Sequence, residues 1–182
     1  EYVNAGANVI ETNTFGANRI KLQKHGLEDQ LEEINRAGVA IARESAAEDT
    51  YIAGAIGPIG EKLKPLGSLS VEDAKSIFLE QSRILVDCDV DLLIIETFAD
   101  LDMIELAVKT IKDAFDIPVL AQMTILNDGT TSYGTPTTVL AKRLTGAGAD
   151  AVGLNCNVGP KTMLEAIDAI TAVTDVPVSV MP

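Results

Sequence analysis

Two side chains that could do chemistry come directly after short apolar runs. Glu96 follows Leu92-Leu93-Ile94-Ile95, and Cys156 follows Ala151-Val152-Gly153-Leu154-Asn155. A carboxylate in such a position costs free energy unless a cation faces it, so Glu96 either pairs with a neighbouring loop or receives a cationic substrate group. A free cysteine is often a small buried apolar residue. At the end of a strand, however, Cys156 is at least as well suited to bind a metal or to act as a nucleophile.

Other reactive residue types are poorly placed. His25 is the only histidine and lies in a helical region before Gly26, where we expect a solvated surface side chain. Cys88 precedes an apolar run, which puts it on the opposite side of the predicted sheet, in a structural role. No lysine lies at the end of a predicted strand, so a Schiff-base mechanism, which needs a desolvated lysine in the pocket, is disfavoured.

The elements that must position these residues alternate regularly along the chain. Strands are expected at residues 8–15, 51–56, 92–95, 118–125, 151–156 and 176–181, with amphipathic helices between them. Ser70 with Asp73 predicts a helix N-cap, and Thr135-Pro136 and Gly159-Pro160 predict helices with proline in the first turn. Strict alternation predicts an α/β fold with a parallel sheet. The first strand lacks the Gly-rich turn of nucleotide-binding open sheets, so a (β/α)8 barrel with its site at the carboxyl ends of the strands is favoured.

Composition narrows the class of protein. The chain has 182 residues, the length of one domain, and a formal net charge of −13. Because no basic cluster interrupts this charge, nucleic acid is not an expected partner. No apolar run reaches the length of a membrane span, so no membrane partner is expected either. The first residues do not resemble a signal peptide, and two cysteines are few for a secreted protein, so we expect a cytoplasmic protein with free thiols.

At the strand ends the sequence resembles the homocysteine S-methyltransferase family. The run Ala5-Gly6-Ala7-Asn8-Val9-Ile10-Glu11-Thr12-Asn13-Thr14-Phe15-Gly16-Ala17-Asn18 is similar to the family's second-strand signature. Ile56-Gly57-Pro58, with Pro65-Leu66-Gly67, resembles its third-strand loop. Ile95-Glu96-Thr97-Phe98 and Gly153-Leu154-Asn155-Cys156 resemble its fourth and sixth strands. The four motifs occur in the family's order and together extend over most of the chain.

The resemblance implies a zinc-dependent TIM barrel that methylates the thiol of homocysteine to give methionine. Cys156 would be the first of three zinc-binding cysteines, and the other two are expected in a Gly-Gly-Cys-Cys motif beyond Pro182. Glu96 would receive the substrate ammonium group. Thr12 and Asn155 would line the homocysteine pocket, with Asn13 beside them.

Residues 1–182 would then be a partial homocysteine-binding barrel domain that holds strands two to seven and lacks the first and eighth. Open barrel edges would permit self-association. The methyl donor is left open among methylcobalamin, a methylated folate route and S-methylmethionine, with cobalamin or folate bound by other domains. The resemblance is strongest to modules joined to methylenetetrahydrofolate reductase or found in cobalamin-dependent methionine synthase; stand-alone S-methylmethionine or betaine users are less similar. The alternatives are a non-catalytic barrel fragment that acts as an association module, and an unrelated (β/α)8 lyase.

Overall fold

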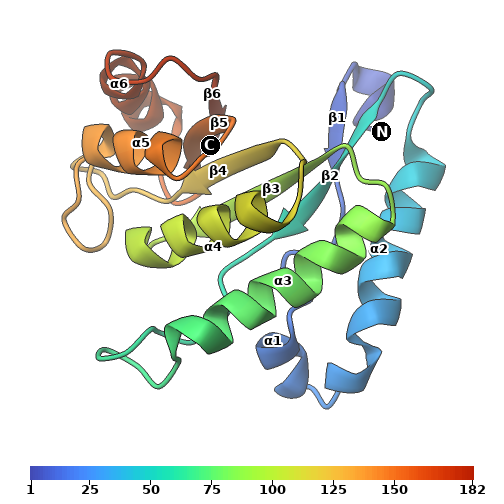
Figure 1. Ribbon diagram of the computed structural model, residues 1–182. Coiled ribbons are helices and arrows are strands. Elements are labelled where there is room, and N and C mark those ends of the chain that lie inside the picture. The colour runs from blue at the N-terminus through green and yellow to red at the C-terminus, as the bar shows by residue number, and fades with distance from the viewer.

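The fold is built on six parallel strands that follow one another in the sheet in the order of the sequence. The computed structural model describes all residues, Glu1–Pro182. The strands are β1 (Val9–Glu11), β2 (Tyr51–Ile56), β3 (Leu92–Phe98), β4 (Val119–Met123), β5 (Ala151–Asn155) and β6 (Val178–Met181). This consecutive parallel order is that of a (β/α)8 barrel, and the sheet curls as part of one (Figure 1). The predicted α/β barrel-type fold is confirmed, as an incomplete barrel.

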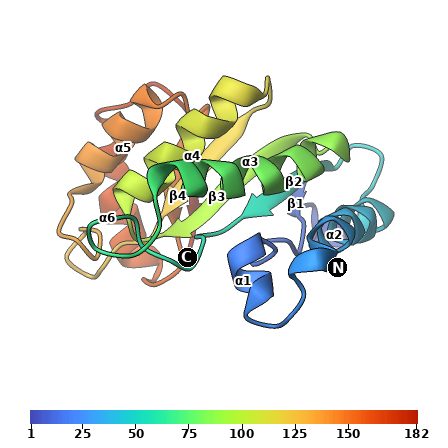
Figure 2. The ribbon, with the colours of Figure 1, turned by 60° about the horizontal axis from the view of Figure 1, so that its bottom comes forward.

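Six α-helices connect the strands. They are α1 (Arg19–Gln23), α2 (Leu31–Ser45), α3 (Val71–Asp87), α4 (Leu101–Ala114), α5 (Thr137–Gly146) and α6 (Pro160–Thr171), with short 3-10 turns η1 (Val3–Ala5) and η2 (Glu28–Gln30). The long helices cover one face of the sheet, as two views show (Figures 1 and 2). Ser70 accepts a hydrogen bond from the Asp73 N–H at 3.0 Å, as its N-cap position predicts. Pro160 is the first residue of α6, as predicted, whereas Pro136 precedes α5 as its N-cap.

The sheet buries both of its faces. On the outer face, alternate strand residues such as Leu93, Ile95 and Val119 are fully buried against the helices in one large core. On the inner face, Ala53, Ala55 and Ile94 form a smaller buried apolar cluster with partly buried neighbours. Polar side chains near the carboxyl ends of the strands, here called the polar rim, include Glu96 on β3 and Asn155 on β5. Glu11, at the end of β1, is paired with Ala53 of the apolar cluster, so the rim borders this cluster directly.

The first strand is shorter than the sequence predicts. Residues 8–15 were expected to be extended, but β1 ends at Glu11 and a turn follows. The threonines after Glu11 have the β-branched side chains typical of strands. Here, however, their hydroxyl groups bind the neighbouring strand: Thr14 Oγ1 donates to Ala55 O at 2.7 Å, and Thr12 Oγ1 accepts from Ala55 N at 3.0 Å. These bonds stabilise a turn that strand propensity does not predict.

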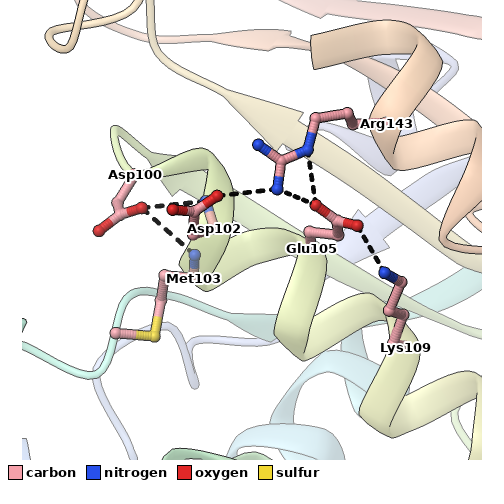
Figure 3. Close-up of polar contacts among 6 residues, drawn as sticks. All are labelled: Asp100, Asp102, Met103, Glu105, Lys109 and Arg143. Atoms are coloured by element: carbon pink, nitrogen blue, oxygen red, sulfur yellow. Dashed lines mark hydrogen bonds and ion pairs between the residues drawn. The ribbon is translucent and has the colours of Figure 1, made fainter. Parts of the chain in front are cut away.

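An ion-pair network on the outer surface joins α4 to α5 (Figure 3). Arg143 of α5 contacts Asp102 and Glu105 of α4, and Lys109 contacts the other oxygen of Glu105. Asp100 caps α4 by accepting from the N–H of Asp102 at 3.0 Å. Exposed ion pairs of this kind contribute about 0–1 kcal/mol each, so the network serves helix packing. No helix of the structure combines the length and apolar character needed to cross a membrane.

Candidate active site at the carboxyl ends of the strands

The amide of Asn155 organises the polar rim. Asn155 is the last residue of β5 and is 2% exposed. Its Nδ2 donates to Glu96 Oε2 at 2.8 Å and to Thr97 Oγ1 at 2.7 Å, while its Oδ1 accepts from the Thr97 N–H at 3.0 Å. Glu96 and Thr97 belong to β3, which is separated from β5 by β4. The amide therefore spans the concave side of the sheet and fixes the end of one strand against another.

Glu96 is a half-buried carboxylate without a cationic partner. No lysine, arginine or histidine nitrogen lies within ion-pair distance of it, so it does not form the salt bridge that was its structural alternative. Desolvation raises the pKa of Glu96, and this outweighs the hydrogen bonds from Thr97 and Asn155 that lower it. Binding of a cationic group would stabilise the ionised form of such a carboxylate.

A second carboxylate adds negative charge to the same region. Glu11 ends β1, and its pKa is raised first by desolvation and then by the charge of Glu96. This coupling shows that the two carboxylates are close enough to repel each other. The inner rim therefore has a negative potential, which favours a cationic ligand group.

Cys156 presents its thiol beside this cluster. It is exposed and has φ 57°, and the next residue, Asn157, has φ 68°. Two successive residues in the left-handed region turn the chain sharply as it leaves β5, and the Asn157 side chain donates to Ile125 O at 2.6 Å. The sulfur lies 3.6 Å from Asn155 Nδ2 and 3.9 Å from Thr97 Oγ1. The structure thus brings together three residues that the sequence selected: Glu96, Asn155 and Cys156.

Thr12 and Asn13 lie on the same rim but make no hydrogen bond to that cluster. Thr12 is 3% exposed, and its hydroxyl group binds Ala55 N and Thr14 Oγ1. Asn13 has an exposed side chain, and neither its backbone N–H nor that of Thr14 donates to an acceptor within the chain. Thr14 is fully buried, so the exposed Asn13 is the residue whose free backbone N–H a ligand could reach, whereas the threonine hydroxyl groups of the segment are occupied.

The remaining candidates lie where the sequence placed them. His25 is exposed, beyond the end of α1. Cys88 is half-buried at the end of α3, where Arg36 Nη1 lies 3.3 Å from its sulfur. Cys88 thus precedes β3, on the side of the sheet away from the rim.

Sequence reasoning did not select Thr97, Glu11 or Gln122. Thr97 has φ 62° at a register shift between Ile95 and Phe98, and this irregularity turns its N–H and hydroxyl toward Asn155. Gln122 is fully buried; its Nε2 donates to Ser179 Oγ at 3.0 Å and its Oε1 has no partner. The signal for Thr97 was present in the Ile-Glu-Thr-Phe run, but strand position alone could not reveal its backbone conformation.

The residues of this chain do not form a complete metal site. No group of three or more histidine, cysteine or acidic residues could hold a metal ion within it. A structural or catalytic zinc site needs at least three protein ligands, so these residues do not complete one. Cys156 has the properties of a single ligand, because it is exposed and lies at the strand ends.

Comparisons with known proteins agree with this geometry. The family model described as "Homocysteine S-methyltransferase" matches residues 1–182. Methionine synthase of Mycobacterium tuberculosis (strain ATCC 25618 / H37Rv) is 33% identical over 192 residues, which cover 100% of this chain and 16% of that protein. Betaine–homocysteine S-methyltransferase 1 of Danio rerio is 35% identical over 178 residues, which cover 96% of this chain and 43% of that protein. The chain thus spans less than half the length of these relatives.

A solved structure has the same fold. The metallated form of the homocysteine methyltransferase MmuM from Escherichia coli superposes with a TM-score of 0.85 at 22% identity, covering 98% of this chain and 68% of that one. Identity to the methionine synthase and to the betaine–homocysteine S-methyltransferase is nearly equal, at 33% and 35%, so identity does not distinguish the methyl donors. The match along the whole chain, together with the shared fold, shows that this chain belongs to the homocysteine S-methyltransferase family.

Proposed function

We propose that these residues form the homocysteine-binding part of an enzyme that transfers a methyl group to the thiol of homocysteine, giving methionine. The observation that carries the proposal is the cluster of Glu96, Asn155 and Cys156, which places an unpaired carboxylate near a thiol at the strand ends. Family membership supports the same reaction class. Because the relatives are much longer, the activity is assigned to the complete protein.

The amino acid part of homocysteine would be bound by groups that the fold leaves unpaired. Glu96 is the receiver of the ammonium group, since it has no cation of its own and lies in a negative region. The exposed Asn13 can donate its free backbone N–H to the substrate carboxylate. Asn155 uses both amide protons and its carbonyl oxygen on Glu96 and Thr97. Its role is therefore to hold Glu96 in place at the floor of the pocket.

Cys156 is proposed as one zinc ligand, with two further thiolates from outside residues 1–182. A bound zinc ion would hold the substrate sulfur as a thiolate near neutral pH, although a free thiol has a pKa of about 8.5. The chain's own contribution is to present the Cys156 sulfur within reach of the Asn155 amide and the Thr97 hydroxyl group.

Neither rival function is favoured by a feature of the structure. An association module would not need an unpaired carboxylate beside an exposed thiol. A Schiff-base lyase would need a lysine at a strand end, and each strand here ends without one. The methyl donor, whether methylcobalamin, a methylated folate or S-methylmethionine, is assigned to parts of the protein outside this chain.

The test is homocysteine binding by the complete zinc-loaded protein, measured by isothermal titration calorimetry. Methionine, which has the same ammonium and carboxylate groups but no free thiol, is the matched control ligand. We expect homocysteine to bind more tightly than methionine and to be converted to methionine when each donor is supplied in turn. Equal or undetectable binding of both ligands would reject the proposed function.

A further inference from the structure

The loop of residues 12–18, which follows β1, is held from outside the barrel by two buried amides. Gln81 of α3 donates its Nε2 to Thr14 O at 2.8 Å and to Asn35 Oδ1 at 3.2 Å. Asn35 of α2 donates its Nδ2 to Ala17 O and to Leu31 O, both at 2.8 Å. Asn35 is 0% exposed and Gln81 1% exposed. Two helices thus bind two carbonyl groups of the loop through one continuous network.

The hydroxyl groups of the loop are fixed from the side of β2. Thr14 has one hydroxyl proton, and it is donated to Ala55 O, which can only accept. The 2.6 Å contact between the two threonine hydroxyl groups must therefore be a donation from Thr12 to Thr14. Because Thr12 gives its one proton to Thr14 and accepts from Ala55 N, it has no proton left for a ligand. The loop can therefore donate to a substrate through its backbone and through the exposed side chain of Asn13, and the direction of both depends on the loop conformation.

Two glycines allow this close attachment. A Cβ atom at Gly38 of α2 would lie 2.6 Å from Thr14 Cγ2, and one at Gly57 would lie inside the ring of Phe15. The loop backbone is also bound at this point, because Phe15 O accepts from Gly57 N at 3.0 Å. The loop is thus fixed by α2, by α3 and by the end of β2.

We infer that Gln81 and Asn35 are positioning residues for the homocysteine site, acting by fixing the peptide groups of the 12–18 loop that face the substrate. The inference rests on the proposed function. Buried amides cost free energy unless every bond is made, and apolar side chains would pack α2 against α3 equally well. Unlike apolar side chains, the amides also fix the orientation of the loop backbone, because each one binds a particular carbonyl group. A fixed loop binds a ligand without a further loss of conformational entropy.

The test is Gln81→Met in the complete protein. Methionine is close in size to glutamine and keeps the packing of α3, but it leaves Thr14 O and Asn35 Oδ1 without their donor. We expect the KM for homocysteine to rise about tenfold or more, since small displacements of binding groups are costly. The turnover number at saturating homocysteine and the zinc content should remain close to those of the wild type.

Leu85→Ala is the matched control on the same helix. Leu85 is fully buried and would lie against a Cβ at Gly54, away from the loop. It should shift chemical denaturation to a lower denaturant concentration but leave the KM unchanged where the protein is folded. An unchanged KM in Gln81→Met, or an equal rise of the KM in Leu85→Ala, would overturn the inference. The proposed function would still stand in that case, provided that the wild type binds homocysteine. Absence of homocysteine binding by the wild type would overturn both.

A second pair of variants keeps the inference testable if Gln81→Met does not fold. Thr14→Val preserves the shape against Gly38 but removes the hydroxyl group that joins Thr12 to Ala55. Thr14→Ser keeps that hydroxyl group. We expect a raised KM in Thr14→Val and a nearly normal KM in Thr14→Ser. Equal KM values for the two variants would overturn the premise of the inference, that a fixed conformation of the 12–18 loop sets the affinity for homocysteine.

Discussion

The hydrogen bonds of Asn155 determine which atoms of the site remain free for a ligand. The two short hydrogen bonds from its Nδ2 and the one accepted by its Oδ1 all go to Glu96 and Thr97. Glu96 receives the Asn155 and Thr97 bonds on the same oxygen, Oε2, which leaves Oε1 without a partner. A carboxylate held through one oxygen with the other free is well arranged to accept a charge-assisted hydrogen bond.

Replacement of this carboxylate should weaken substrate binding selectively. We expect Glu96→Gln to raise the KM for homocysteine by about ten- to a hundredfold, because a hydrogen bond to a charged group contributes about 1.5–3 kcal/mol. Zinc content should not change. Glu80→Gln is a suitable control, since Glu80 pairs with Arg19 on the surface. Normal homocysteine affinity of Glu96→Gln in calorimetry would show that Glu96 is structural.

The raised pKa of Glu96 predicts a pH dependence of homocysteine binding. Above this pKa the carboxylate is ionised and attracts the substrate ammonium; below it the neutral acid loses that attraction. The KM should therefore increase as the pH falls, and the increase should begin at a higher pH than for an ordinary glutamate. The KM of Glu96→Gln, measured with zinc content monitored, should be flat over the same range. A parallel rise in both proteins would assign the effect to another group.

At the scale of elements, apolar runs predicted all six strands but not every strand end. β2 was predicted with its observed bounds, Tyr51–Ile56, because its run is uniformly apolar and a Gly-Pro pair follows it. The predicted end of β1 was wrong, because the threonine hydroxyl groups after Glu11 bind to β2. Local strand propensity does not contain this tertiary contact. The role of Thr97 was missed for a similar reason, because its left-handed backbone is set by the register of β3 with β4.

Some site residues could likewise be predicted from the local sequence, whereas others depend on tertiary contacts. Glu96 and Cys156 could be selected because each lies at the end of an apolar run, where a barrel collects its polar groups, whereas Asn155 was selected through the family resemblance. Gln81 and Asn35 could not be selected, since polar residues within amphipathic helices are usually solvated. Their burial depends on how α2 and α3 meet the 12–18 loop.

The contact between α2 and this loop can be tested with two glycines. Gly→Ala in a helix usually stabilises a protein by about 0.5–1 kcal/mol. At Gly38 we expect the opposite, a loss of about 1–3 kcal/mol, because the new Cβ would overlap a threonine methyl group that hydrogen bonds hold in place. Gly146→Ala in α5 is the control, since no atom lies within 4 Å of its Cβ position. Chemical denaturation showing equal effects would contradict the close packing.

At the scale of the whole molecule, the sheet has two open edges. β1 and β6 each pair with a single neighbour, and Val9 on β1 is 45% exposed. All four residues of β6 are partly exposed. In a closed barrel such strands would pair on both sides, and unpaired edges promote association with other chains.

A polypeptide that consists only of residues 1–182 should therefore self-associate. We expect light scattering after size-exclusion chromatography to show dimers or larger species whose proportion rises with concentration. Val9→Lys, which places a charge on the exposed edge, should reduce that proportion. A strict monomer with cooperative unfolding and protected amides in β1 and β6 would contradict this expectation.

The central claim is that this site activates homocysteine with Cys156 as a metal ligand, and zinc analysis of the complete protein tests it most directly. Cys156→Ser should lose both bound zinc and methyl transfer, because a zinc site with one fewer thiolate has a much lower affinity. Cys88→Ser, which changes the other cysteine on the opposite side of the sheet, should retain both. Near-stoichiometric zinc with normal turnover in Cys156→Ser would contradict the account.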